Sequence, residues 1–228
     1  KNILAHYDLG NKFYSTWLDE TMTYSSAYFS ENHSLDLSLA QVNKYQEILK
    51  ILNPKKGAHI LEIGCGWGGF AEVAALAGYS VAGITISDEQ YDYAKNRIAT
   101  KQLEDKVQIL KIDYRDVQGQ FDHVVSIEMI EAVGKEFWMG YFKKIENCLK
   151  PGGTSVIQSI LINDADFKKY LRHTDFIQQY IFPGGVLPCP GVISRILNKL
   201  NFDQFKFVHF GLDYARTLQM WHETFLQK

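Results

Sequence analysis

The sequence lacks several features that would mark out particular classes of protein. Its 228 residues contain three cysteines, Cys65, Cys148 and Cys189, which are odd in number and far apart. This pattern excludes a disulfide framework and a clustered metal-ligand motif, and it favours a reducing compartment. No apolar run reaches the ~18 residues that a membrane-spanning helix needs. The formal net charge of −2 gives no basic excess for binding nucleic acid.

The start of the chain also carries no targeting signal. Lys1-Asn2-Ile3-Leu4 does not open a signal peptide, and no initiator Met is present. The reducing compartment predicted from the cysteines leads us to expect a cytoplasmic protein, and the missing Met leads us to treat the chain as a fragment. The composition, 46% hydrophobic and 22% charged, suits one globular domain with a full core.

Strand-like and helical runs alternate from residue 53 onward, which is typical of an α/β sheet. Residues 1–52 are rich in Tyr and Phe and are expected to be mostly helical. The expected strands are 59–63, 80–86, 107–112, 122–127 and 154–161, with a turn at 150–153 and an antiparallel edge strand at 205–208. The expected helices are 69–77, 88–100, 135–148, 164–182, 190–200 and 214–227.

A glycine-rich turn follows the first expected strand. Residues 58–69 read AHILEIGCGWGG, in which Ile60, Leu61 and Ile63 fit a buried parallel strand. Glycine allows the backbone to turn sharply and a ligand to approach closely. A strand, a glycine loop and a helix in this order predict a nucleotide-like cofactor.

Two kinds of cofactor fit this loop, and charge separates them. Gly64, Gly66 and Gly69 match G-x-G-x-x-G, the dinucleotide fingerprint. Gly64, Gly66 and Gly68 match G-x-G-x-G, and an acid, Glu62, precedes this second pattern. A carboxylate would repel a pyrophosphate but attract the ammonium and sulfonium of S-adenosylmethionine (SAM). A dinucleotide site also uses an acid about 20 residues further on, which is missing here. The sequence favours SAM, with a dinucleotide or a purely structural turn as alternatives.

Polar residues follow other expected strands as well. They fall in 62–68, 85–90, 113–115 and 127–131. Ligands of open α/β sheets bind beyond the carboxyl ends of the strands. Four independent strand ends therefore indicate one site.

Eight stretches together resemble the cyclopropane-fatty-acid synthase family of methyltransferases and cover nearly the whole chain. They are HYDLGN at 6–11, YSSAYF at 24–29, LEIGCGWGG at 61–69, GITISDEQ at 83–90, DYRD at 113–116, EMIEAVG at 128–134, YIFPGG at 180–185 and DYARTL at 213–218. Many methyltransferases share the glycine loop, whereas the early and late aromatic stretches are far more specific.

The resemblance implies a Rossmann-like class I methyltransferase fold, with a mostly parallel seven-stranded sheet, helices on both faces and a helical N-terminal cap. It divides one methyltransferase domain into a lid at 1–52, a cofactor core at 53–163, inserted helices and a loop over the acyl site at 164–204, and an edge strand and helix at 205–228. Family members usually run further, so we expect a C-terminal segment to be missing.

The resemblance also implies a reaction. A cis double bond of a phospholipid acyl chain attacks the sulfonium methyl, and a cation forms. The new methyl loses a proton, thought in this family to go to bound bicarbonate, and the ring closes to a cyclopropane. Such a site needs an acyl tunnel, an anion cradle and protection of the cation from water.

Five residues match the family's bicarbonate site. Glu131 matches the essential carboxylate, Tyr214 a tyrosine that contacts the anion, and Ile127 a residue that offers its backbone amide. Ser26 and Gln158 stand where the family often has Cys and His. Gln158 can still donate a hydrogen bond to an anion, but these changes leave open whether the protein cyclopropanates or only methylates.

Other matches concern the methyl donor. Two of the matched positions have a structural alternative. Gln90 forms a capping box with Ser87, and Asp113 could cap the turn that follows it. Glu128, one turn before Glu131, is variable in type in the family. The residues expected to bind SAM are Tyr24, Ser25, Glu62, Gly64, Gly66, Gly68, Thr85, Gln90, Asp113 and Tyr114.

The expected substrate is an unsaturated phospholipid, which requires contact with a bilayer. Only Lys168, Lys169 and Arg172 form a basic cluster, so we expect peripheral contact with the inner face of the membrane. The apolar stretch Phe176–Pro190 is expected to form a wall of the acyl channel, and a homodimer is compatible with the sequence. Two alternatives remain: an amine N-methyltransferase with a short pocket, and a catalytically silent SAM-binding domain.

Overall fold

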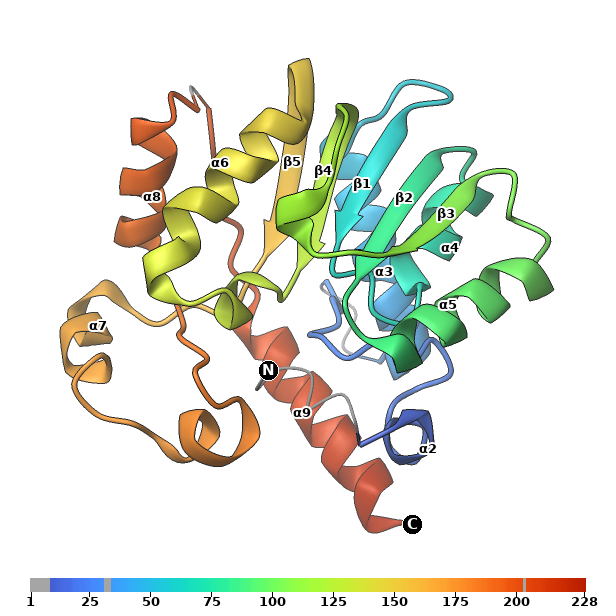
Figure 1. Ribbon diagram of the computed structural model, residues 1–228. Helices are drawn as coiled ribbons and strands as arrows, with labels where there is room; N and C mark the ends of the chain where they lie inside the picture. The colour runs from blue at the N-terminus through green and yellow to red at the C-terminus, as the bar shows by residue number, and fades with distance from the viewer. Residues whose placement is uncertain (1–8, 31–33, 203) are drawn as a thin grey trace.

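The computed structural model describes residues 9–30, 34–202 and 204–228 and is built around a parallel sheet (Figure 1). Its strands are β1 (His59–Ile63), β2 (Ser80–Thr85), β3 (Val107–Lys111), β4 (Phe121–Ile127) and β5 (Leu149–Gln158). They lie in the order β3-β2-β1-β4-β5, and all neighbours are parallel. The order reverses between β1 and β4, and such a switch point opens a crevice at the carboxyl ends of the strands.

Helices of different lengths surround the sheet. The α-helices are α2 (Asn11–Tyr14), α3 (Leu37–Leu52), α4 (Gly69–Leu76), α5 (Asp88–Thr100), α6 (Trp138–Cys148), α7 (Asp164–Tyr170), α8 (Pro190–Lys199) and α9 (Gly211–Leu226). Short helical turns are η1 (Tyr114–Asp116), η2 (Ile130–Ala132), η3 (Lys135–Phe137) and the π-turn η4 (Ile177–Ile181). Among the described residues, no helix is both long and apolar enough to cross a bilayer.

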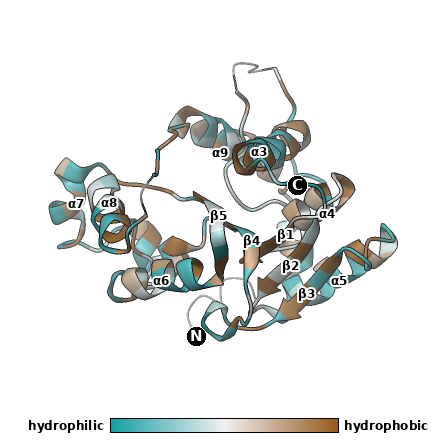
Figure 2. Cartoon of the chain, turned by 90° about the horizontal axis from the view of Figure 1, so that it is seen from above, coloured by the Kyte–Doolittle hydropathy of each residue, from teal (hydrophilic) through white to brown (hydrophobic). Residues whose placement is uncertain are grey.

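One hydrophobic core lies on each face of the sheet, so the molecule has three layers, with helices on both sides of the strands (Figure 2). On one face, apolar side chains of α3, α4 and α5 pack against the strands. On the other face, α6 and α8 do so. Alternate residues of β1 supply both cores, since Ile60 belongs to the first and Leu61 to the second. This is the packing expected of a sheet buried on both sides.

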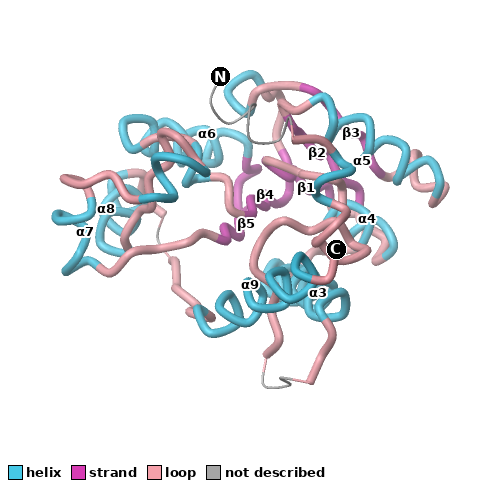
Figure 3. Tube along the Cα trace, turned by 90° about the horizontal axis from the view of Figure 1, so that it is seen from below, coloured by secondary structure: helices cyan, strands magenta, loops and turns pink. Residues whose placement is uncertain are grey.

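A third cluster fastens the N-terminal segment to the C-terminal helix. It joins Tyr14, Phe29, Trp67 and Trp221, so it links the first 30 residues with the glycine loop and α9. Figure 3 shows α3 and α9 along the same side of the sheet. Segment 23–29 is bonded to both helices, and it thereby reaches the carboxyl ends of the strands.

The structure confirms most of the predicted strands and helices to within a residue or two. β1 and α5 have the predicted bounds. The α5 boundary follows from its cap, because the Ser87 side chain accepts a hydrogen bond from the backbone N–H of Gln90. Pro190 similarly stands in the first turn of α8, where its missing N–H costs nothing.

Four predictions about the fold are wrong for the described residues. The sheet has five strands instead of seven, since 205–208 pairs with no strand and Phe205 and Phe207 remain exposed. Residues 150–153 belong to β5, where the register shifts against β4, instead of forming a turn before it.

The other two corrections concern helices. The predicted helix 164–182 is interrupted between α7 and η4, because Tyr170 and Gln178 are used in tertiary hydrogen bonds to 185–187. Residues 15–30 are irregular instead of helical, since side chains of other elements bind their backbone. A helical N-terminal cap is therefore not confirmed, and the first stretch of the family resemblance lies partly outside the described residues.

Candidate functional site

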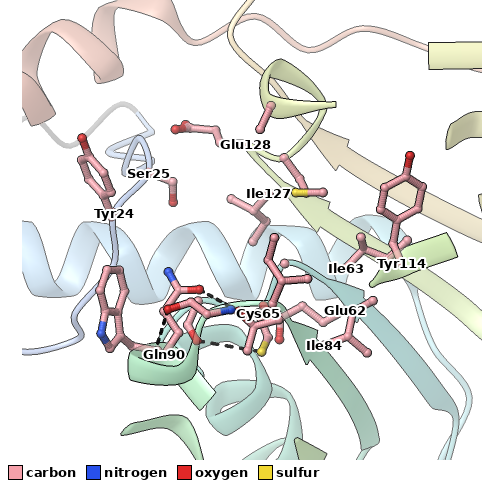
Figure 4. A pocket seen from close by; sticks show the side chains of 18 of the residues that line it. Tyr24, Ser25, Glu62, Ile63, Cys65, Ile84, Gln90, Tyr114, Ile127 and Glu128 are labelled. Carbon is pink, nitrogen blue, oxygen red and sulfur yellow. Dashed lines mark hydrogen bonds between the residues drawn. The ribbon is translucent and has the colours of Figure 1, made fainter. Parts of the chain in front are cut away.

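A cavity of about 340 Å³ opens beyond the carboxyl ends of β1, β2 and β4 (Figure 4). The loops after these strands form its floor, and residues 22–25 close one side. It is the crevice that the strand order predicts. The predicted site residues that line it are Tyr24, Ser25, Glu62, Gly64, Gly66, Thr85, Gln90, Asp113, Tyr114 and Ile127.

The three glycines of the loop have different tasks. All have positive φ angles, at +79° for Gly64, +52° for Gly66 and +84° for Gly68. A Cβ on Gly66 would meet nothing within 4 Å and would project from a residue that lines the cavity. A Cβ on Gly68 would lie 3.2 Å from Ala94, so Gly68 serves packing and starts α4. Gly66 is thus the glycine that keeps space free for a ligand.

Glu62 places a buried acid beneath the loop. It is 3% exposed, and its Oε2 has no hydrogen-bond partner. Burial raises the pKa of Glu62 well above its usual value, while Arg97 and then Lys44 act to lower it. A buried acceptor that lines the cavity and has no hydrogen-bond partner fits a cationic ligand group. This observation supports the choice of SAM over a dinucleotide.

The end of β2 is ordered by the capping box. Thr85 Oγ1 donates to Gln90 Oε1 at 2.8 Å, and Ser87 caps α5. Gln90 therefore has the structural role that the sequence offered as an alternative. Because Gln90 also lines the cavity and its carbonyl accepts from Thr85, its side-chain N–H groups are the donors that it can offer there.

Asp113 likewise takes the capping role. Its carboxylate accepts from the backbone N–H of Arg115 at 2.9 Å and from the Arg115 guanidinium at 2.7 and 2.9 Å. The hydrogen bonds from Arg115 lower the pKa of Asp113 despite partial burial. Tyr114 adds its ring to the cavity wall and packs edge-on against Tyr141.

A second polar group lies beside the cavity and centres on Glu128. Its Oε1 accepts from the backbone N–H of Ser26 at 2.8 Å and from Gln158 Nε2 at 2.9 Å. Gln158 Nε2 also donates to the Ser26 carbonyl at 3.2 Å. The structure thus brings two predicted site residues together around an acid that the sequence analysis did not select.

The backbone of Glu128 is strained. Its φ of +49° lies in the left-handed region, which residues other than glycine adopt only at a cost. The strain turns the carboxylate toward Ser26 and the cavity, which Glu128 itself lines. Positive φ at an acid after a buried strand is an observation that points to function.

Glu131 is the partner acid. Its Oε1 accepts from the backbone N–H of Ile160 at 2.5 Å, and its Oε2 is buried without a partner. Burial first and the charge of Glu128 second raise the pKa of Glu131 to about 8. Burial also raises the pKa of Glu128, but Lys44, Ser26 and Gln158 oppose this rise. At neutral pH Glu131 holds a proton, whereas the hydrogen-bond donors and the charge of Lys44 favour the charged form of Glu128.

Bicarbonate does not fit these residues as they are placed. The amides of Ser26 and Gln158, which were expected to bind it, donate to Glu128 instead. Ile127 pairs with Gln158 across the sheet, and the backbone amide that donates to Glu131 is that of Ile160. No sequence pattern indicated Ile160, since its side chain is apolar and only its N–H is used.

Tyr214 stands on α9 near the same acids. Burial raises its pKa, and the charges of Glu128, Tyr24 and Glu131 add to the rise. The Tyr214 hydroxyl is therefore a neutral donor at physiological pH. Across the described residues, no group of His, Cys, Asp and Glu side chains could hold a metal ion, and the three cysteines are free and buried.

Sequence comparison places this site in a known context. A family described as "Mycolic acid cyclopropane synthetase" matches residues 1–228. The tuberculostearic acid methyltransferase UfaA1 of Mycobacterium tuberculosis is 40% identical over 245 residues, covering 100% of this chain and 55% of the relative. The cyclopropane-fatty-acyl-phospholipid synthase of Escherichia coli K12 is 39% identical over 222 residues, covering 97% of this chain and 55% of the relative. The chain spans about half the length of these relatives.

Solved structures agree with this match. The mycolic acid cyclopropane synthase CmaA1, complexed with SAH and CTAB, has a TM-score of 0.91 at 28% identity, covering 98% of this chain and 81% of that one. A coclaurine N-methyltransferase has a TM-score of 0.76 at 18% identity, which shows a shared fold alone. The fold is that of a Rossmann-like class I methyltransferase. Because the sequence match and the structural match both extend over nearly all of it, the chain belongs to the cyclopropane synthase family of SAM-dependent methyltransferases.

Proposed function

We propose that this chain is the catalytic part of a SAM-dependent methyltransferase that forms a cyclopropane ring at the cis double bond of an unsaturated phospholipid acyl chain. The observation that carries the proposal is Glu128, a carboxyl group held at the edge of the cavity by hydrogen bonds from Ser26 and Gln158. Relatives named as fatty-acyl and mycolic acid enzymes support a lipid substrate.

The residues around the cavity fit SAM. Glu62 would face its positive charge, Gly66 would leave room for it, and Gln90 would donate a hydrogen bond. When bound, SAM supplies a methyl group on a sulfonium leaving group. The protein's part is to hold that methyl against the substrate and to exclude water.

The acids beside the cavity provide the proton acceptor. As the double bond attacks the methyl, the C–S bond breaks and a carbon cation forms. Glu128 removes a proton from the new methyl, and the electrons of that C–H bond close the ring. Glu128 Oε1 is held by two donors, so Oε2 is the oxygen that accepts the proton. Glu131, already protonated, does not compete for it.

Aromatic rings supply the apolar wall. Tyr24 contacts Phe182 at 6.4 Å between ring centroids and Trp221 at 5.6 Å. Such faces stabilise a nearby cation without reacting with it. Phe182 belongs to the stretch Phe176–Pro190, which we propose as part of the acyl channel. We further propose that the protein is cytoplasmic and makes peripheral contact with the inner face of the membrane. We also propose a homodimer and the division of the domain into the four parts given above.

The test uses the purified chain, SAM with a fully deuterated methyl group and vesicles of monounsaturated phospholipid. We expect S-adenosylhomocysteine to form and the acyl chain to gain one carbon that retains two of the three deuterium atoms. Vesicles of saturated phospholipid are the control and should remain unchanged. Retention of all three deuterium atoms would contradict deprotonation, and SAM binding without any lipid product would favour the silent domain.

The amine alternative is tested in the same assay. Adding small primary and secondary amines should produce no S-adenosylhomocysteine above background. An amine methylated faster than the lipid would overturn the assignment of the substrate class.

A further inference from the structure

α3 contributes a buried lysine that the proposed reaction does not use. Lys44 is 2% exposed, and its Nζ donates a hydrogen bond of 2.5 Å to Ser25 Oγ. None of the ion pairs found between described residues includes Lys44. A buried ammonium is costly unless an anion accompanies it. A negative group of a ligand would therefore stabilise the charged form of Lys44.

Ser25 connects this lysine with the cavity. Its carbonyl accepts from Gln41 Nε2 at 2.9 Å, so two residues of α3, one turn apart, hold Ser25 at its carbonyl and its hydroxyl. Lys44 donates to the hydroxyl oxygen, and the hydroxyl must therefore donate its own proton elsewhere. Ser25 lines the cavity, and Figure 4 shows its side chain reaching toward the interior. The hydroxyl is a donor for an anionic part of the ligand.

The opposite charge is supplied by Glu62. Its unpaired Oε2 and the Ser25 hydroxyl belong to the same cavity, so one ligand meets an acid and a lysine-backed donor. An amino-acid end, with its ammonium and carboxylate, matches both. A phosphate would suit Lys44 but would be repelled by Glu62.

We propose that Lys44, acting through the Ser25 hydroxyl, recognises the carboxylate at the amino-acid end of SAM, while Glu62 receives the ammonium. The inference rests on SAM being the methyl donor and adds the residues that select its amino-acid end. Lys44 is a positioning residue, because Ser25 makes the contact.

The electrostatics of the cavity agree with this role. Burial lowers the pKa of Lys44 to about 7, and the charges of Glu128, Asp19 and Glu62 limit the fall. A ligand carboxylate beyond Ser25 would raise this pKa again and keep the ammonium charged. Ligand binding and the charge of Lys44 are thereby coupled.

The experiment compares two ligands that differ only in the carboxylate. Isothermal titration calorimetry measures SAM and decarboxylated SAM against wild type, Lys44→Met and Ser25→Ala, without lipid. We expect Lys44→Met to weaken SAM binding by roughly 10- to 100-fold and to change binding of the decarboxylated ligand by less than about 2-fold. Ser25→Ala should act in the same direction. Lys50→Met, on the exposed side of α3, is the control and should alter neither affinity.

Two results would overturn the inference. An equal loss for both ligands would mean that Lys44 only shapes the cavity, and an unchanged SAM affinity would mean that Lys44 serves Glu128 instead. If Lys44→Met does not fold, Ser25→Ala decides in the same way, by its loss of affinity for SAM compared with its loss for decarboxylated SAM. Wild type that binds neither ligand would contradict the proposed function itself, whereas wild type that binds SAM keeps the two questions apart.

Discussion

At the scale of single residues, two acids of similar sequence context have different surroundings. Glu128 accepts two hydrogen bonds, and the charge of Lys44 acts to lower its pKa, whereas burial and the charge of Glu128 raise the pKa of Glu131 to about 8. Pairs of titratable groups whose surroundings separate their pKa values commonly divide acid and base roles. The strained backbone of Glu128 adds to this assignment.

The first prediction follows from that division. Glu128→Gln removes the proton acceptor, so we expect turnover on unsaturated phospholipid to fall by roughly 10²- to 10⁴-fold, with SAM affinity nearly unchanged. Glu131→Gln replaces a protonated acid by a neutral amide, so its turnover should fall less than that of Glu128→Gln. Initial rates and calorimetric affinities of both variants measure the difference. The reverse order would return the catalytic carboxylate to Glu131, as the family resemblance implied.

The second prediction concerns the glycine loop. Gly66→Val places a branched side chain in the open space above the loop, and we expect SAM binding to be lost. Gly78→Val is a matched control, because Gly78 also has positive φ and open space but lies outside the cavity residues. Calorimetry on both folded variants checks this, and normal SAM binding by Gly66→Val would remove the loop from the site.

At the scale of elements, segment 23–29 is an irregular strap held by its neighbours. Gln41 and Lys44 of α3 bind it from one side, and Asp213 and Thr217 of α9 bind it from the other. Its backbone pairs with none of the described strands, and side chains accept hydrogen bonds from the N–H groups of Ser26, Ala27 and Phe29. The strap carries Tyr24, Ser25 and Ser26 into the site, so α9 helps to fix the position of these residues.

The third prediction tests this connection. Asp213 is 7% exposed and its Oδ2 accepts from the N–H of Phe29 at 3.0 Å. Asp213→Ala leaves that N–H unpaired, and we expect a loss of about 1–3 kcal/mol in the free energy of unfolding, together with slower turnover. Leu212→Ala, on the exposed face of α9, is the control. Urea unfolding curves measure the change, and equal stability of the two variants would refute the role of Asp213.

At the scale of the whole molecule, the two buried acids connect the site with global stability. Burial and the charge of Glu128 hold the pKa of Glu131 at about 8, above its ordinary value of 4.5. Between these values the folded chain binds more protons than the unfolded chain. The contribution of Glu131 to stability is therefore fully present below pH 4.5 and is lost as the pH rises toward 8.

The fourth prediction is a difference in pH profile. Relative to Glu131→Gln, wild type should lose stability steadily from pH 4.5 to about 8 and show no further difference above it. Glu128, Tyr214 and Ser159 surround Glu131 and stay the same in both proteins. Thermal unfolding across this range measures the difference. Parallel profiles would mean that Glu131 titrates as an ordinary carboxyl.

The sequence alone determined the features that depend on neighbouring residues. The apolar run of β1, the glycine loop and the Ser87 cap of α5 are local patterns, and the structure reproduces them. The donor cavity could also be predicted, because parallel strands place their carboxyl ends at one edge of the sheet.

Only the tertiary structure decided which group accepts hydrogen bonds from Ser26 and Gln158, the residues expected to bind bicarbonate. Glu128 meets Ser26 across 102 residues and Gln158 across 30, and a positive φ at Glu128 directs its carboxylate there. Likewise, residues 205–208 alternate as a strand does but find no partner strand to pair with. Such outcomes depend on which distant groups satisfy each polar atom, and no local spacing records that choice.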